Sequence, residues 1–274
     1  MHQKTIAIYC FLDDFLKATG HQEDCRNRIS DAEVMTAALL STLYFYGNQT
    51  TALLYMHQHQ GVYWIDKSQF NRRLRRLQTQ LWAIFRALGQ TLKELNTTCR
   101  YLLDSFPVAM CDNIRIARCR LLQDEAYRGY SASKRRYFYG FRVQVITTAD
   151  GIPVDFYIYA GAFVDATILQ VMPIELPKGS VLYADSGYLN YDIEELMAEC
   201  DQIQLLTARR SNSKRQDEPA VAFLKKHYRR RIETVFSQIK AHSFPAKIHA
   251  VTVQGFLLKL SLFIMAFTFD QLTT

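Results

Sequence analysis

Three carboxylates occupy positions from which a protein can act on phosphate esters. Asp104 and Asp185 each end an apolar run with the composition of a β-strand, and Glu233 lies in a basic segment with helical spacing. Cleavage of a phosphodiester needs an activated water or hydroxyl and neutralised charge at the phosphorus, which two divalent ions supply when carboxylates hold them. The three acids therefore predict a metal-dependent site for chemistry on DNA phosphates.

Two other acids compete for roles in this site. Asp112 is an alternative to Asp104, but Asp104 is preferred because it directly follows the apolar run Tyr-Leu-Leu. Asp165 either supports the metal ligands or caps a helix, and capping is the commoner role for such a residue.

Two cations share a helical face with Glu233. Arg229 precedes it by four residues and Lys240 follows it by seven, spacings that return to one face of an α-helix. We expect both to position phosphates on either side of the cleaved bond, although an exposed ladder of ion pairs would have the same spacing.

A second basic helix is predicted from Lys67 to Leu77, with Ser68 as a candidate cap and with Phe70 and Leu74 on its apolar face. Its arginines then project from the other faces toward DNA, as in helix-turn-helix modules; a solvated basic helix is the alternative. The residues predicted to contact nucleic acid outside the acidic site are Arg72, Arg73, Arg75 and Arg76 of this helix, Lys134, Arg135 and Arg136 beside Tyr137 and Tyr139, and Arg209 and Arg210 in a polar loop.

The elements that must position these residues fall into two regions. Residues 1–98 have helical periodicity, with a capping box at Ser30 and Glu33. Residues 99–274 begin with a strand from Tyr101 to Phe106 and continue with two β-rich runs joined by an Asp-Gly turn. The order β-β-β-α-β-α-β-α predicts an α/β domain with a mixed five-stranded sheet between helices, preceded by a helical DNA-binding region.

Composition favours a polyanionic partner and a reducing compartment. The formal net charge of +7 suits phosphates, because clustered cations displace condensed counterions. Six scattered cysteines with no Cys-x-x-Cys pair predict reduced thiols, although Cys111 and Cys119 with a distant His would be a zinc alternative. The apolar segment from Gly255 to Phe269 is shorter than a membrane span of about 20 residues, so we expect a buried helix, no membrane partner and a cytoplasmic protein.

The chain resembles bacterial insertion-sequence transposases of the DDE class, and most closely the insertion-sequence 982 group. The resemblance rests on Leu-Leu-Asp104-Ser-Phe-Pro, on the run from Ser133 to Arg142 that leads into Asp-Gly-Ile-Pro, on Tyr-Ala-Asp185-Ser-Gly-Tyr and on Arg229-Arg-Arg-Ile-Glu233-Thr-Val-Phe. Related elements often carry a Tyr before the Arg of this motif, with two residues between them. This chain has Lys226 at that position, and Tyr228 is adjacent to Arg229.

The resemblance implies a ribonuclease-H-like core in which Asp104, Asp185 and Glu233 bind two Mg²⁺ ions, or Mn²⁺ in the test tube. It implies double-stranded DNA as the partner, namely the terminal inverted repeats of an element and the target DNA. It also implies a homodimer on the DNA and a location at the bacterial nucleoid. Two alternatives stay open: a nuclease of the same fold that joins nothing, and a non-catalytic DNA-binding protein derived from a transposase.

Overall fold

The structure, a computed structural model, describes residues 1–112, 116, 119, 121–122, 124–131, 135–209, 213, 215–243 and 248–272. The chain forms two compact units. The first unit combines Met1–Leu88 with Ile239–Thr274, and the second is Gly89–Gln238. The predicted functional boundary after residue 98 stays a prediction; by packing, the last helix of the chain groups with the N-terminal helices.

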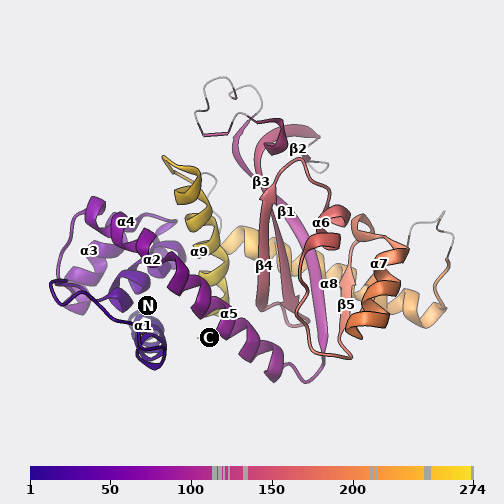
Figure 1. The fold of residues 1–274 in the computed structure, drawn as a ribbon, viewed down its shortest axis with the longest axis horizontal. Helices are drawn as coiled ribbons and strands as arrows, with labels where there is room; N and C mark the ends of the chain where they lie inside the picture. The colour runs from indigo at the N-terminus through magenta and orange to yellow at the C-terminus, as the bar shows by residue number, and fades with distance from the viewer. Residues whose placement is uncertain are drawn as a thin grey trace. The chain divides into compact units, whose positions relative to one another are not determined.

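Helices make up the first unit (Figure 1). They are α1 (His2–Ala18), α2 (Asp31–Phe45), α3 (Gln49–Gln60), α4 (Lys67–Arg76), the first part of α5 (Gln78–Leu95) and α9 (Val253–Leu272). Helix α2 is the centre of this unit, because it is buried along most of its length and contacts α1, α3, α4 and α9. The predicted capping box at its start is confirmed: Ser30 accepts from the Glu33 N–H, and Glu33 accepts from the Ser30 N–H.

Helix α4 begins two residues earlier than a Ser68 cap would place it. Asp66 is the N-cap, and its carboxylate accepts the N–H groups of Ser68 and Gln69 at 2.7 and 3.0 Å. The candidate cap at Ser68 was therefore wrong, because Asp66, two residues upstream, accepts the free N–H groups at the start of the helix and its negative charge is favoured at the positive end of the helix dipole. Phe70 and Leu74 are buried, as the helical periodicity predicted.

Helix α9 is apolar on nearly all its faces. Within the part of the chain that the structure describes, it is the one helix long and apolar enough to cross a membrane, yet 67% of its apolar window is buried inside the protein. Phe269 packs edge-to-face on Phe11 of α1 at 5.4 Å, and Asp270 accepts a hydrogen bond from Lys4 at 2.7 Å. The predicted buried C-terminal helix is confirmed.

The second unit is built on a six-stranded sheet (Figure 1). Its strands are β1 (Arg100–Asp112), β2 (Arg128–Ser131), β3 (Arg136–Thr148), β4 (Pro153–Ala160), β5 (Val181–Ala184) and β6 (Gln204–Thr207). Its helical segments are the end of α5, η2 (Glu125–Tyr127), α6 (Asp165–Val171), η3 (Ser186–Tyr188), α7 (Tyr191–Leu196), the π-helical η4 (Met197–Asp201) and most of α8 (Pro219–Ser243).

The sheet is mixed, as the order of elements predicted. Strand β3 pairs antiparallel with β1 on one edge and with β2 and β4 on the other, whereas β1, β5 and β6 pair in parallel. The Asp-Gly hairpin is also confirmed: Gly151 has φ of +100°, a conformation that glycine adopts at no steric cost. The sixth strand, β2, was not predicted, because its sequence Arg-Gly-Tyr-Ser has no apolar run of the kind that marks the equally short β5 and β6.

Strand β1 runs through Pro107, where the sequence predicted its end. Pro107 faces Arg142 of β3, while β5 pairs only with Arg100 to Leu103. From Asp104 onward, β1 therefore has no pairing to β5 on its second edge, and a residue without an N–H group is tolerated there.

Helices cover both faces of this sheet. Phe106 of β1 packs edge-to-face on Phe236 of α8, with 6.3 Å between ring centroids. On the opposite face, Ser105 of β1 hydrogen-bonds Asp165 of α6. Figure 1 accordingly shows α8 behind the sheet and α6 in front of it. Because side chains alternate along a strand, Asp104 shares the α8 face with Phe106.

Candidate active site

Asp104 and Asp185 lie side by side at the end of two parallel strands. Leu103 of β1 and Ala184 of β5 are register partners, so the two acids are the next residues on their strands. Neighbouring strands are about 4.8 Å apart. Asp185 keeps an extended backbone, with φ of −73° and ψ of 166°, so the two side chains leave the sheet on one face.

Helix α8 presents Glu233 on that same face. Phe236 is about one turn after Glu233 and packs on Phe106, which is two residues after Asp104. The buried side of α8, which includes Ile232, holds the helix to the sheet and leaves Glu233 exposed. An aromatic pair of this kind contributes about 0.5–1.5 kcal/mol beyond its buried area. The helix is thereby fixed at the level of the acids.

Arg229 connects the second and third acids. Its Nε lies 3.6 Å from Asp185 Oδ1 and 3.5 Å from Glu233 Oε1. Arg229 therefore lies between Asp185 and Glu233, and Asp104 is on the strand next to Asp185, whereas the ligand oxygens of the three acids do not all lie within 4.8 Å of one another. Lys240 is exposed on α8 two turns after Glu233.

One oxygen of this site lacks a hydrogen bond. Asp185 Oδ1 is buried and accepts none from the residues that the structure describes, although the guanidinium of Arg229 is near it. A buried carboxylate oxygen in this state is costly unless a cation neutralises it. With Asp104 on the adjacent strand, the donor set of hard carboxylate oxygens fits Mg²⁺ or Mn²⁺.

A network that the sequence did not reveal supports Asp104 from the other face of the sheet. The Asp165 carboxylate accepts hydrogen bonds from Ser105 at 2.6 Å and from Tyr159 at 2.5 Å, and Arg142 Nη1 lies 3.6 Å from it. Val164, not Asp165, is the N-cap of α6. Of the two roles considered for Asp165, capping is therefore not the one it has; it anchors the residue next to Asp104.

Two phenols beside the acids stay protonated. Burial raises the pKa of Tyr188 well above 10, with Asp165 and Asp104 adding to the effect. Burial and Asp165 likewise raise the pKa of Tyr159. The Tyr188 hydroxyl is buried without a hydrogen-bond partner among the described residues. A signal for Tyr188 existed in the sequence, since it ends the Asp185-Ser-Gly-Tyr segment.

Tyr228 packs within the second unit. It is 8% exposed, stacks on Tyr183 of β5 at 4.0 Å between ring centroids, and accepts a hydrogen bond from Arg100 at 3.0 Å. Since Tyr183 is two residues before Asp185, this stack helps to hold α8 against the strand that carries Asp185.

The other candidate ligands either belong to other groups of described residues or have side chains outside them. Asp112 ends β1, and its side chain lies outside the described residues. Among the residues that the structure describes, one group of three has all its ligand atoms within 4.8 Å of one another: His21, Glu23 and Asp31 in the first unit. That group is part of an ion-pair network, because Asp31 also binds Arg73. Cys111 and Cys119 belong to no such group of described residues.

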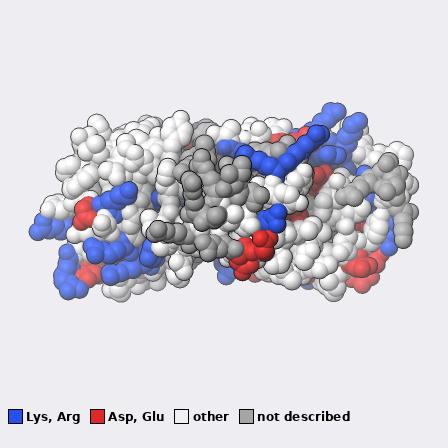
Figure 2. Space-filling model, turned by 90° about the horizontal axis from the view of Figure 1, so that it is seen from above, with Lys and Arg blue, Asp and Glu red and all other residues white. Residues whose placement is uncertain are grey.

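The basic residues predicted to contact DNA separate into two sets. The first set is exposed. It comprises Arg72, Arg75 and Arg76 on α4, and Arg135 and Arg136 where β3 begins. In Figure 2 Lys and Arg side chains gather on the surface of the helical unit. Lys134 and Arg210 lie outside the described residues.

Arg73 and Arg209 are instead engaged within the protein. Arg73 donates to Asp31 and to the carbonyl of Ile29. Arg209 binds both oxygens of Glu194, at 2.9 and 2.7 Å, with its side chain 15% exposed. The sequence shows the charge of both arginines but not their partners, which come from distant segments.

Comparison with known proteins agrees with this geometry. The second unit has a ribonuclease-H-like fold in which a mixed sheet positions acids at the ends of adjacent strands. Residues 94–249, more than half of the chain, match the family described as "Transposase DDE domain". The chain belongs to this family of DDE transposases. No curated protein sequence matches it.

Proposed function

We propose that this protein cleaves DNA phosphodiesters at the ends of a mobile element and joins the freed 3′-hydroxyl to target DNA. The observation that carries the proposal is the parallel register of β1 and β5, which makes Asp104 and Asp185 neighbours; the contacts of Arg229 with Asp185 and Glu233 support the inclusion of Glu233. Membership of the DDE transposase family supports the same chemistry.

Divalent metal is the proposed cofactor, as two Mg²⁺ ions or Mn²⁺ in their place. Asp104 and Asp185 would hold both ions and Glu233 one of them. When bound, the ions activate the attacking oxygen and neutralise charge on the leaving oxygen. The buried Asp185 Oδ1 without a hydrogen bond supports cation binding at this position.

The remaining residues of the site have positioning roles in this proposal. Arg229 releases the two carboxylates when metal enters and turns to a DNA phosphate, since its side chain is 52% exposed. Lys240 contacts a phosphate further along the strand. Asp165 holds Ser105 and, through it, the strand that carries Asp104.

The proposed substrate is double-stranded DNA, comprising terminal inverted repeats and target, bound by a homodimer. Arg72, Arg75, Arg76, Arg135 and Arg136 supply sequence-independent phosphate contacts. The assignment to the insertion-sequence 982 group, a helical DNA-binding domain over residues 1–98, a catalytic domain over 99–274 and a location at the bacterial nucleoid are parts of the same proposal.

The test is incubation of the purified protein with labelled element-end DNA and an unlabelled target, with and without Mg²⁺. We expect nicked and joined products that require metal and disappear in Glu233→Gln. Nicking without joining, even from a pre-cut 3′-end, would mean a nuclease. Binding without any cleavage would mean a DNA-binding protein.

A further inference from the structure

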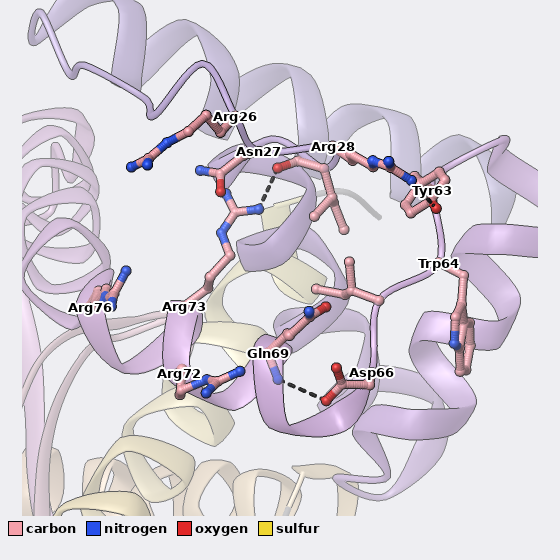
Figure 3. A pocket seen from close by; sticks show the side chains of 12 residues that line it. Arg26, Asn27, Arg28, Tyr63, Trp64, Asp66, Gln69, Arg72, Arg73 and Arg76 are labelled. Atoms are coloured by element: carbon pink, nitrogen blue, oxygen red, sulfur yellow. Dashed lines mark hydrogen bonds between the residues drawn. The ribbon is translucent and has the colours of Figure 1, made fainter.

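The first unit contains a pocket whose lining residues, between Arg26 and Arg76, do not include the three acids. It is formed by the loop that precedes α2, by the segment between α3 and α4, and by the exposed side of α4 (Figure 3). Its volume is about 580 Å³, within the range of pockets that hold organic ligands.

The pocket carries a large excess of positive charge. Five arginines line it and one acid, Asp66. The carboxylate of Asp66 is already used, because it caps α4 by accepting two backbone N–H groups. An anionic ligand is therefore favoured over a neutral or cationic one.

Two of these arginines have no ion-pair or hydrogen-bond partner among the described residues, whereas Arg28 donates to the Tyr63 hydroxyl. Arg72 and Arg76 are one turn apart and exposed, and neither makes an ion pair or hydrogen bond with a residue that the structure describes. Arg26, by contrast, pairs with Asp24, and Arg73 pairs with Asp31. Like charges four residues apart repel each other on a helix, so a bound phosphate would relieve a cost that the free protein carries.

Aromatic rings form another part of the wall. Trp64 is 40% exposed and Tyr63 is 49% exposed. The edge of His57 contacts Trp64 at 6.1 Å between centroids, and the Nδ1–H of His57 donates to the carbonyl of Val62 at 2.9 Å. Arg28 lies over the Tyr63 ring, as Figure 3 shows. Both rings are thus held in place, and Trp64 offers an exposed surface.

Exposed aromatic rings beside unpaired arginines suit a particular form of nucleic acid. Single strands bind to basic grooves in which bases stack on aromatic side chains, whereas the bases of a duplex stack on each other and offer no face to a protein. A duplex would use the arginines of this pocket and leave Trp64 without a role.

We propose that this pocket binds an unpaired segment of DNA, with phosphates on Arg72 and Arg76 and a base stacked on Trp64. The choice of DNA as the ligand rests on the proposed function; the pocket itself does not involve the three acids. Such a segment arises wherever strands separate at an element end or at a target.

The fluorescence of Trp64 gives a direct test. The chain has two tryptophans, so Trp82→Phe leaves Trp64 as the single reporter. We expect saturable quenching when this variant is titrated with a short oligothymidylate in EDTA, and little quenching with a blunt duplex of equal length. Absence of quenching during single-strand binding, measured in parallel by anisotropy of a labelled oligonucleotide, would overturn the proposal.

Substitutions then separate stacking from charge. Trp64→Ala should weaken single-strand binding at least about fivefold, with Trp64→Phe retaining most of it, because base–aromatic stacking is lost only in the first. Arg72→Ala and Arg76→Ala should each reduce the slope of log affinity against log salt by about 0.7. Arg86→Ala is the matched control, since Arg86 is exposed on α5 of the same unit but does not line the pocket.

The outcomes distinguish this inference from the proposed function. Equal losses for single strands and duplexes in Trp64→Ala, or equal effects of Arg72→Ala and Arg86→Ala, would reject the pocket as a single-strand site. Circular dichroism of each variant checks that the helical unit is folded. Because binding is measured without metal, a protein that binds single strands here but cleaves nothing would contradict only the proposed function.

Discussion

Asp104 of β1 and Asp185, the residue directly after β5, each follow the register pair of Leu103 and Ala184 on two adjacent parallel strands. The backbone alone therefore sets their separation, and no loop has to fold to bring them together. Sites built on strands are held more precisely than sites built on loops. Glu233 arrives separately on α8, with Arg229 between it and Asp185.

Neutralising any one of the three acids should remove cleavage. Asp104→Asn, Asp185→Asn and Glu233→Gln keep the side-chain shape but weaken cation binding, and we expect rates to fall by more than about 100-fold, since even partners of metal ligands contribute 10–100-fold. DNA affinity in EDTA should stay within about twofold of the wild type, because these substitutions remove no phosphate contact. Metal-dependent cleavage by the triple variant would contradict the assignment.

Removing Arg229 should make metal binding tighter in the absence of DNA. Arg229 competes with the metal for Asp185 and Glu233, and exposed ion pairs contribute about 0.2–1 kcal/mol each, so we expect about two- to fivefold tighter Mn²⁺ binding in Arg229→Gln by calorimetry. Arg230→Gln is the control, because Arg230 is an exposed neighbour on α8 without an ion pair to any described residue. Unchanged Mn²⁺ affinity in Arg229→Gln would mean that the arginine does not compete.

Arg209 should prove to be structural. Its removal leaves Glu194, whose side chain is 10% exposed, with the hydroxyl of Thr207 but without its cation, and breaking a buried pair costs about 3 kcal/mol in the free energy of unfolding. Arg215→Ala in the same loop should cost less than about 1 kcal/mol, because its pair with Glu195 is exposed. Urea denaturation measures both. A large change in the salt dependence of DNA binding with unchanged stability would instead support the predicted DNA contact.

Alkaline pH should destabilise the second unit through Tyr159. The pKa of Tyr159 is raised in the folded protein by burial and by Asp165, while an unfolded tyrosine titrates near 10. Its contribution is fully present below pH 10 and is lost as pH rises above 10, by about 1.4 kcal/mol per pH unit. Tyr159→Phe should flatten this slope in urea denaturation between pH 9.5 and 11, whereas the exposed Tyr130→Phe should not.

Much of the fold could be predicted because its signals are local. The capping box at Ser30, the Asp-Gly turn at Gly151 and the apolar run before Asp104 each depend on residues within one segment. Asp104 and Asp185 could be proposed as candidates for the same reason, since a carboxylate that follows an apolar strand-like run is visible in the sequence.

The remaining features depend on partners from distant segments. Nothing near Asp165 in the sequence indicates that Ser105 and Tyr159 donate to it. The charge of Arg73 predicted a DNA contact, but its guanidinium binds Asp31, which precedes it by a whole helical hairpin. Cations are visible in a sequence; which of them are already neutralised is decided only by packing.

The parallel pairing of β1 with β5 also has a consequence for folding during synthesis. Such a pairing joins segments far apart in the chain and forms slowly, after the intervening hairpin and α6 have been made. Glu233 leaves the ribosome later still. Under the proposed function, a nascent chain lacks its third metal ligand until Glu233 has emerged from the ribosome. An incomplete chain therefore does not cleave DNA near the translating ribosome.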